Sequence, residues 1–204
     1  MDARLWELAA ATPGFLPEPE AELLYEIARE AGRLGPLLEV GSYCGKSALF
    51  LGAGAREAET VLFSIDHHRG SEEQQPGQEY HNPALVDASG RVDTLPCLRR
   101  TLEAAGLQDV VIPIVGESAT IARHWRTPLA LVFVDGGHNE GAVNADLDGW
   151  SPKLLPGGLL AFHDVFEDPR EGGQAPFHAY RRAVASGLFT EAQSGGSLRV
   201  LRRT

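Results

Sequence analysis

The chain has 204 residues and a formal net charge of −10, with 43 % hydrophobic and 23 % charged residues. This length suits a single globular domain, and the negative charge argues against broad binding to nucleic acid or to an anionic membrane. No apolar run reaches the roughly 18 residues of a membrane span, and the residues after Met1 show no signal-peptide pattern. Because its two cysteines lack the spacing of a metal site, we expect a reducing, cytoplasmic setting.

The first 36 residues precede the first predicted strand. Residues 1–20 are rich in proline and alanine, which favours a loose arm, whereas residues 21–31 carry apolar side chains at helical spacing. We therefore expect one domain over residues 1–204, in which an N-terminal arm and helix (residues 1–36) precede a core (residues 37–204).

From residue 37 onward, short apolar runs alternate with helical patterns. Strands are predicted at residues 37–40, 61–65, 110–115, 129–134 and 159–162. Helices are predicted at residues 46–54, 95–105 and 177–185, with Thr94 as the N-cap of the second. Two further helices are predicted to begin at Gly116-Glu117-Ser118 and after Asn139, which is the expected N-cap. Two last runs, residues 189–193 and 198–201, predict a hairpin. The alternation implies a parallel sheet, into which the hairpin inserts one antiparallel strand.

Two polar stretches are too long to be simple connections between elements. Residues 67–82 follow the second strand, and residues 167–176 follow the fifth. Loops of this length in compact domains are usually functional or disordered. We expect both stretches to select the substrate, and the first to cover the binding pocket.

A glycine loop, Glu39-x-Gly41-x-x-x-Gly45, follows the first strand and leads into Lys46-Ser47. The loop lacks the G-x-G-x-x-G of a dinucleotide-binding fold, and it is one residue short of a phosphate-binding P-loop. Glu39 is an acid inside an apolar strand, where a carboxylate is costly to bury without a partner. An amine-bearing ligand or a basic side chain of the protein would be such a partner.

Further motifs lie at the ends of later strands. Asp66 ends the second strand, Val134-Asp135-Gly136-Gly137-His138 follows the fourth, and Gly157-Gly158 precedes His163-Asp164 around the fifth. Together with the glycine loop and the hairpin, these motifs resemble the class I S-adenosylmethionine-dependent methyltransferases, of the small-molecule O-methyltransferase type. The resemblance runs from about residue 37 to the C-terminus. It implies an α/β Rossmann-like three-layer sandwich whose mostly parallel seven-stranded sheet has the order 3-2-1-4-5-7-6.

The resemblance also implies S-adenosyl-L-methionine as cofactor. Glu39 would hold its amine, the start of the following helix its carboxylate, and Asp66 its ribose hydroxyls. Ser118 would lie near the adenine, although a helix cap is an equal alternative for this serine. The residues expected to bind the cofactor are Glu39, Gly41, Ser42, Gly45, Ser47, Asp66, His67, Glu117, Ser118 and Asp135.

In a sheet of this order the fourth and fifth strands are neighbours, about 4.8 Å apart. Their ends bring Asp135 beside His163 and Asp164, a set that can ligate Mg²⁺ or another divalent cation. Asp135 would then both ligate the ion and take the proton of an acceptor hydroxyl. His138 is the rival base, because a neutral histidine needs no metal. We expect the methyl acceptor to be a small molecule. For the oligomeric state we consider a homodimer.

Other classes of protein stay open at this point. A nicotinamide-dependent oxidoreductase is disfavoured by the incomplete glycine fingerprint and by the closing hairpin. A nucleotidase built on Lys46-Ser47 is disfavoured by the short loop. A non-catalytic Rossmann-like binding protein is disfavoured by the acids at three strand ends.

Overall fold

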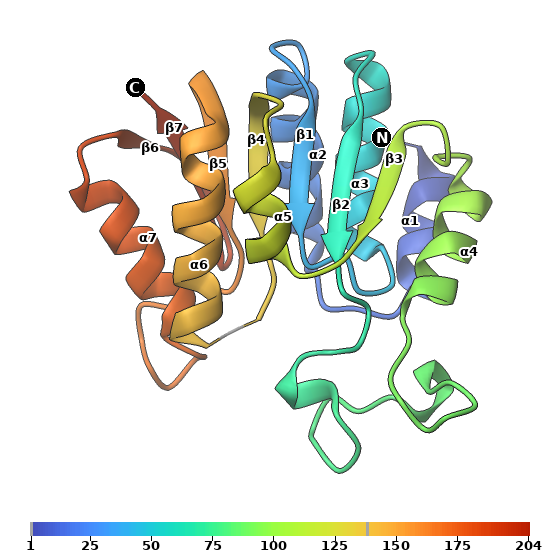
Figure 1. The fold of residues 1–204 in the computed structure, drawn as a ribbon. Helices are drawn as coiled ribbons and strands as arrows, with labels where there is room; N and C mark the ends of the chain where they lie inside the picture. The colour runs from blue at the N-terminus through green and yellow to red at the C-terminus, as the bar shows by residue number, and fades with distance from the viewer. Residues whose placement is uncertain (1, 138) are drawn as a thin grey trace.

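The computed structural model describes residues 2–137 and 139–204. Seven strands form one sheet in the order β3-β2-β1-β4-β5-β7-β6, with helices on both faces (Figure 1). This confirms the expected three-layer fold. The strands are β1 (Leu37–Val40), β2 (Leu62–Asp66), β3 (Val111–Val115), β4 (Leu129–Val134), β5 (Leu154–Phe162), β6 (Phe189–Gly195) and β7 (Leu198–Arg203).

The register of the sheet sets the position of the strand ends. Val40 of β1 lies opposite Ile65 of β2 on one side and Val134 of β4 on the other. Val134 in turn lies opposite Phe162 of β5. The carboxyl ends of four parallel strands are therefore level, and the residues that follow them lie at one edge of the sheet. The pairing of β7 with β5 and with β6 is antiparallel, as the hairpin predicted.

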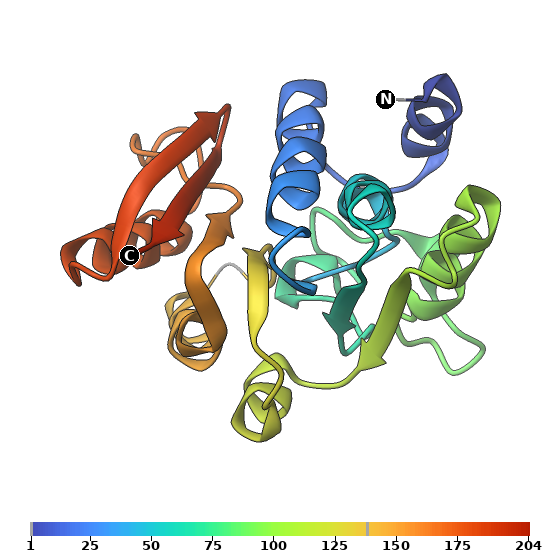
Figure 2. The same ribbon diagram turned by 90° about the horizontal axis from the view of Figure 1, so that it is seen from above.

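Helices cover both faces of the sheet (Figure 2), and an apolar core lies on each face. Successive residues of a strand point to opposite faces, so Phe133 of β4 enters one core and Val132 the other. The first core packs against α1 (Ala3–Ala11), α2 (Glu18–Ala31), α3 (Lys46–Glu57) and α4 (Leu95–Ala105). The second packs against α5 (Ser118–His124), α6 (Glu140–Trp150) and α7 (Ala175–Ala185).

The prediction of a loose N-terminal arm is wrong, because residues 3–11 form helix α1. The side chain of Asp2 accepts a hydrogen bond from the N–H of Arg4 and caps this helix. Leu5 is buried, and the Trp6 ring packs on Phe50 of α3 with centroids 4.9 Å apart. Packing on the core thus overrides the proline- and alanine-rich composition of this segment.

Other boundaries shift by a few residues. β5 begins at Leu154 rather than at residue 159, and its register against β4 is interrupted between Leu129 and Leu131. Thr94 precedes α4 as predicted, but its hydroxyl makes no capping bond and lies 2.7 Å from Nδ1 of His68. Within the described part of the chain, no helix has the length and apolar character to cross a membrane.

Candidate active site

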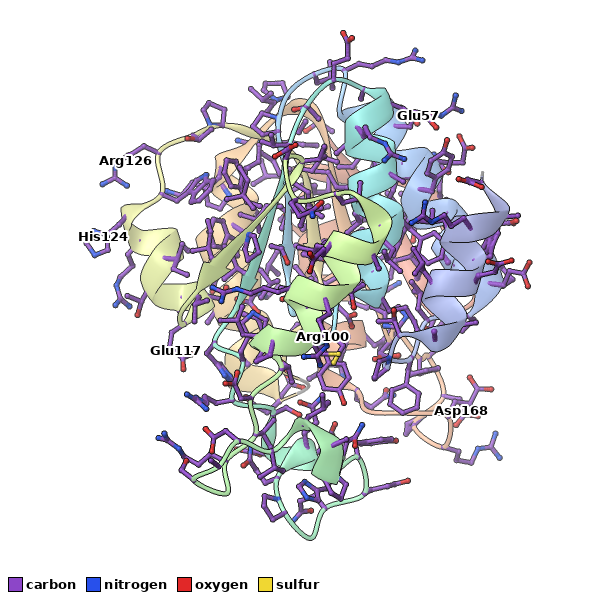
Figure 3. All side chains as sticks on the ribbon, turned by 90° about the vertical axis from the view of Figure 1, so that its right-hand side faces the viewer. Glu57, Arg100, Glu117, His124, Arg126 and Asp168 are labelled. Carbon is purple, nitrogen blue, oxygen red and sulfur yellow. The ribbon has the colours of Figure 1, made fainter. Side chains whose placement is uncertain are left out.

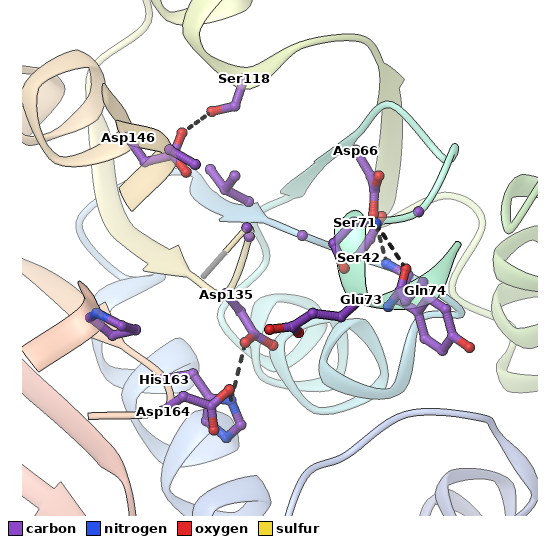
Figure 4. A pocket seen from close by; sticks show the side chains of 18 of the residues that line it. Ser42, Asp66, Ser71, Glu73, Gln74, Ser118, Asp135, Asp146, His163 and Asp164 are labelled. Carbon is purple, nitrogen blue, oxygen red and sulfur yellow. Dashed lines mark hydrogen bonds and ion pairs between the residues drawn. The ribbon is translucent and has the colours of Figure 1, made fainter. Parts of the chain in front are cut away.

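A cavity of about 860 Å³ opens at the carboxyl edge of the sheet (Figure 4). The segment between β2 and α4 projects beyond this edge (Figure 3) and contributes part of the cavity wall. Most of the predicted site residues line the cavity: Gly41, Ser42, Ser47, Asp66, His67, Glu117, Ser118, Asp135, His163 and Asp164. Glu39 and Gly45 are not among the lining residues. His138, the predicted alternative base, lies outside the described residues.

The two glycines of the loop after β1 serve the packing of the protein itself. Gly41 has a φ of +91°, and a Cβ there would collide with the carbonyl oxygen of Asp135. Gly45 also has a φ of +91°, and a Cβ there would lie 2.7 Å from Leu98 of α4. Positive φ values of this kind favour glycine. The glycines therefore let the loop pack closely between α4 and the end of β4.

Glu39 lies behind the cavity wall and is fully buried. Its carboxylate accepts hydrogen bonds from the hydroxyls of Ser64, at 2.7 Å, and Ser47, at 2.9 Å. Burial raises the pKa of Glu39 to about 7, although the two serine hydroxyls oppose the rise. Two hydroxyls thus stand where the sequence suggested a basic side chain or a ligand amine, and Ser47 separates Glu39 from the cavity.

Ser42 is the unsatisfied polar group of this loop. Its side chain is buried and lines the cavity, and its Oγ atom has no hydrogen-bond partner among the described residues. Buried polar groups are nearly always hydrogen-bonded, because an unpaired one costs free energy. A ligand that offers a polar group to this position would supply the missing partner.

Asp66 connects the end of β2 to the glycine loop. Its Oδ2 atom accepts a hydrogen bond of 2.9 Å from the N–H of Tyr43, and its Oδ1 atom accepts one of 2.7 Å from the N–H of His68. Tyr43 and His68 both have positive φ values, of 44° and 59°, which are uncommon for residues other than glycine. The carboxylate of Asp66 therefore supports two unusual backbone conformations at the cavity wall.

Ser118 joins α5 to α6 and caps no helix. Its hydroxyl donates to Asp146 of α6 and accepts a hydrogen bond of 2.8 Å from the indole N–H of Trp150. Asp146 is buried and lines the cavity. Burial raises its pKa to about 6, against the opposing hydrogen bond from Ser118. Sequence reasoning missed this aspartate, although an acid three residues after Val143 lies on the apolar face of the helix and is a recognisable signal.

Asp135, His163 and Asp164 come together at the ends of β4 and β5, as predicted. One ligand atom from each residue lies within 4.8 Å of the other two. Nδ1 of His163 lies 3.1 Å from Asp135 and 3.4 Å from Asp164. Asp164 has a φ of 54°, a strained conformation that proteins concentrate at functional sites.

Two further acids that the sequence did not reveal join this cluster. The carboxylate of Glu20, in the first turn of α2, lies 2.6 Å from Nε2 of His163. Glu73, from the segment after β2, lines the cavity and points toward Asp135 (Figure 4). Burial alone would lower the pKa of His163, but the carboxylates of Asp135, Asp164 and Glu20 outweigh it and raise the pKa to about 12. The surrounding carboxylates therefore favour protonation of this ring when no cation is bound.

Aromatic side chains from two distant segments lie at the mouth of the cavity. Phe15, between α1 and α2, contacts Tyr80, between β2 and α4, with ring centroids 5.3 Å apart. Both line the cavity and both are exposed, by 77 % and 43 %. Large exposed aromatic surfaces beside a cavity mark a place where ligands bind. The expectation that residues 67–82 cover the pocket is confirmed, whereas the role of residues 13–16 in its wall was not foreseen.

The comparisons with known proteins agree with this geometry. Residues 38–165 match the protein family described as "Methyltransferase domain". An O-methyltransferase from Bacillus cereus, solved in complex with SAH, has a TM-score of 0.68 and 17 % identity and covers 100 % of this chain and 92 % of its own. The O-methyltransferase TomG from Streptomyces achromogenes, involved in tomaymycin synthesis and solved in complex with SAM, has a TM-score of 0.67 and 18 % identity and covers 100 % of this chain and 91 % of its own.

A third structure is that of the SAH-bound methyltransferase PaMTH1 from Podospora anserina. It has a TM-score of 0.66 and 17 % identity, and it covers 100 % of this chain and 89 % of its own. The family match spans more than half of the chain, and the solved structures share its fold over its whole length. The chain therefore belongs to the methyltransferase-domain family and has the fold of the class I S-adenosylmethionine-dependent methyltransferases.

Proposed function

We propose that this protein transfers a methyl group from S-adenosylmethionine to a hydroxyl oxygen of a small molecule, in the cytoplasm. The observation that carries the proposal is the continuity of one cavity between the glycine loop, with Ser42 and Asp66, and the cluster around Asp135. The two halves can hold a donor and an acceptor side by side, and such proximity accelerates a reaction between them. Oxygen as the accepting atom is supported by two structural neighbours that are O-methyltransferases.

The cofactor half of the cavity fits S-adenosylmethionine. The unpartnered hydroxyl of Ser42 and the first turn of α3 offer donors for a carboxylate. Asp66 offers carboxylate oxygens to ribose hydroxyls, as acids at this position do in nucleotide-binding sheets. Glu117, Ser118 and Asp146 line the next part of the wall and are assigned to the adenosine. When bound, this cofactor supplies a methyl group on a positively charged sulfur.

The acceptor half fits a divalent cation. Two carboxylates and one imidazole, with ligand atoms within 4.8 Å of one another, form a donor set that suits Mg²⁺, Mn²⁺ or Zn²⁺. Such an ion would lower the pKa of an acceptor hydroxyl. Asp135 faces the cavity and is the residue that we assign to receive the hydroxyl proton. His138 stays the alternative base, and Phe15 and Tyr80 are assigned to the apolar part of the acceptor.

The direct test combines ligand binding with turnover. Isothermal titration calorimetry should detect binding of S-adenosylhomocysteine but not of NADH. Incubation with S-adenosylmethionine and a panel of phenols, sugars and other hydroxyl compounds should release S-adenosylhomocysteine and yield an O-methylated product by mass spectrometry. Tight NADH binding without binding of S-adenosylhomocysteine would overturn the proposal. Cofactor binding without turnover on any acceptor would favour a non-catalytic binding protein.

A further inference from the structure

The most unusual buried charge outside the predicted site is the carboxylate of Glu20. Its side chain is only 2 % exposed, although it belongs to the first turn of α2, where acidic side chains are normally solvated. Glu20 lies 143 residues before its partner His163 in the sequence. Burial of a carboxylate destabilises the folded protein unless the carboxylate oxygens accept hydrogen bonds.

Every contact of this carboxylate fixes its orientation. Oε1 accepts a hydrogen bond of 2.6 Å from the N–H of Ser197 and one of 3.0 Å from the Ser197 hydroxyl. Oε2 lies 2.6 Å from Nε2 of His163. Gly196 has a φ of +55°, and a Cβ at this position would collide with Oε1 of Glu20. The turn between β6 and β7 therefore leaves room for the carboxylate and holds it from one side.

The direction of the hydrogen bond between Glu20 and His163 follows from this arrangement. An ionised carboxylate only accepts hydrogen bonds, so Nε2 of His163 must carry the proton that it shares with Oε2. The other ring nitrogen, Nδ1, then points toward Asp135 and Asp164, at 3.1 Å and 3.4 Å, where a bound cation would take the place of its proton. The ring is also held by an edge contact with Phe133, with centroids 6.1 Å apart.

We propose that Glu20 is a positioning residue for a cation bound by Asp135, His163 and Asp164. It holds the proton on Nε2 of His163 and thereby presents the Nδ1 atom as the ligand. A histidine that ligates a metal through one nitrogen usually donates its other N–H to a carboxylate, which sets the tautomer and the ring orientation. This inference rests on the proposed cation site, and it adds a residue that no motif of the sequence marks.

A purely structural role is the competing explanation, because Glu20 also joins α2 to the turn of the hairpin. Substitution with glutamine separates the two explanations. The backbone N–H of Ser197 can only donate, so the amide oxygen of a glutamine must face Ser197 and its NH₂ group must face Nε2 of His163. Nε2 must then accept, so the one proton of the neutral ring is held on Nδ1, and Nδ1 can no longer ligate a cation.

The experiment titrates Mn²⁺ into wild-type protein, Glu20→Gln and Glu30→Gln by isothermal titration calorimetry. Glu30 lies on the same helix and pairs with Arg202 at 2.8 Å, so its substitution removes the same charge away from the cluster. We expect Glu20→Gln to weaken Mn²⁺ binding by about 10- to 100-fold, Glu30→Gln to leave it unchanged, and neither variant to weaken binding of S-adenosylhomocysteine.

Equal Mn²⁺ affinity of Glu20→Gln and wild type would overturn this inference alone. Absence of Mn²⁺ binding to the wild type would refute the cation site and, with it, this inference. The proposed methyl transfer would still be tested separately, by S-adenosylhomocysteine binding and turnover. If circular dichroism shows that Glu20→Gln does not fold, the tautomer of His163 can be determined by ¹⁵N NMR of the wild-type protein with Zn²⁺ bound. A proton on Nε2 and none on Nδ1 of His163 supports the inference, and the reverse tautomer overturns it.

Discussion

Asp66 at the end of β2 holds the backbone of Tyr43 in the glycine loop after β1, through the 2.9 Å hydrogen bond from the Tyr43 N–H to Oδ2. The same carboxylate lines the cavity. The residue assigned to the ribose therefore also shapes the loop that is assigned to the methionine end of the cofactor. A substitution at Asp66 must affect both the free protein and its complex.

Asp66→Asn should lower both the melting temperature and the affinity for S-adenosylhomocysteine. Asparagine keeps one carbonyl oxygen, so it can accept from Tyr43 or from His68 but not from both as the carboxylate does. The unpaired N–H would cost about 1–3 kcal/mol of stability. Differential scanning fluorimetry and calorimetric titration measure the two effects, and an unchanged melting temperature would contradict the structural part of this assignment.

Ser42→Ala and Ser64→Ala form a matched pair of buried serine substitutions. The Ser42 hydroxyl has no partner among the described residues, whereas the Ser64 hydroxyl bonds to Glu39 at 2.7 Å. Ser42→Ala should therefore leave the stability of the free protein unchanged or raise it, and should weaken S-adenosylhomocysteine binding by about tenfold. Ser64→Ala should destabilise the free protein by about 1 kcal/mol.

Urea unfolding and calorimetric titration distinguish these two variants. A Ser42→Ala protein that binds the cofactor as tightly as wild type would show that the ligand does not use this hydroxyl.

Asp135→Asn should abolish most of the turnover while leaving the affinity for S-adenosylhomocysteine nearly intact. Loss of a general base typically lowers kcat by about 10²- to 10⁴-fold, and Asp135 also belongs to the group of candidate cation ligands. Steady-state kinetics on an identified acceptor, with Glu30→Gln as an active control, test this expectation. Full activity of Asp135→Asn would remove Asp135 from the mechanism.

Chelation with EDTA should suppress turnover without displacing the cofactor, and added Mg²⁺ or Mn²⁺ should restore it. The candidate cation ligands lie at the ends of β4 and β5, whereas Ser42 follows β1 and Asp66 ends β2. Elemental analysis of the purified protein supplies the independent measurement. Undiminished rates in excess EDTA, with no metal detected, would favour His138 as the base.

Asp146→Asn should raise the stability of the protein and change its pH dependence. Burial raises the pKa of Asp146 from 3.8 to about 6 in the folded protein. Between these values the folded state binds more protons than the unfolded state, so the free energy of unfolding falls as the pH rises. Below 3.8 the carboxyl group is protonated in both states, and above about 6 its full cost is present.

The asparagine variant lacks this titration. We therefore expect its free energy of unfolding to equal that of the wild type near pH 3.8 and to exceed it by about 1–3 kcal/mol at neutral pH. Urea unfolding at a series of pH values measures the difference, and a constant difference at all pH values would show that Asp146 does not titrate in this range.

The sequence was sufficient for the sheet and for the edge at which the cavity lies. Strand ends in parallel sheets meet at one edge, so Asp66, Asp135 and His163 could be placed together without coordinates. The same rule says nothing of side chains that reach the edge from a helix. Glu20 and Asp146 were missed for this reason, since each is an acid on a helix whose partner is distant in the sequence.

The helix at residues 3–11 was missed for a different physical reason. Its composition favours a loose arm, whereas the Asp2 cap, burial of Leu5 and Ala9, and packing of Trp6 on Phe50 stabilise the helix. The partners of Glu39 were equally invisible, because Ser47 and Ser64 meet it only after the loop and the second strand have folded. Tertiary contacts decide such cases, and local sequence patterns do not encode them.

The close packing of Gly41 against the carbonyl of Asp135 limits how this enzyme can be re-engineered. The proposed donor and acceptor regions therefore meet in a backbone contact at this point. Substitutions at residues 135–137 that aim at new acceptors will disturb cofactor affinity as well. Variation at Phe15 and Tyr80, which reach the mouth of the cavity from separate segments and are proposed to contact the acceptor, would leave this contact unchanged.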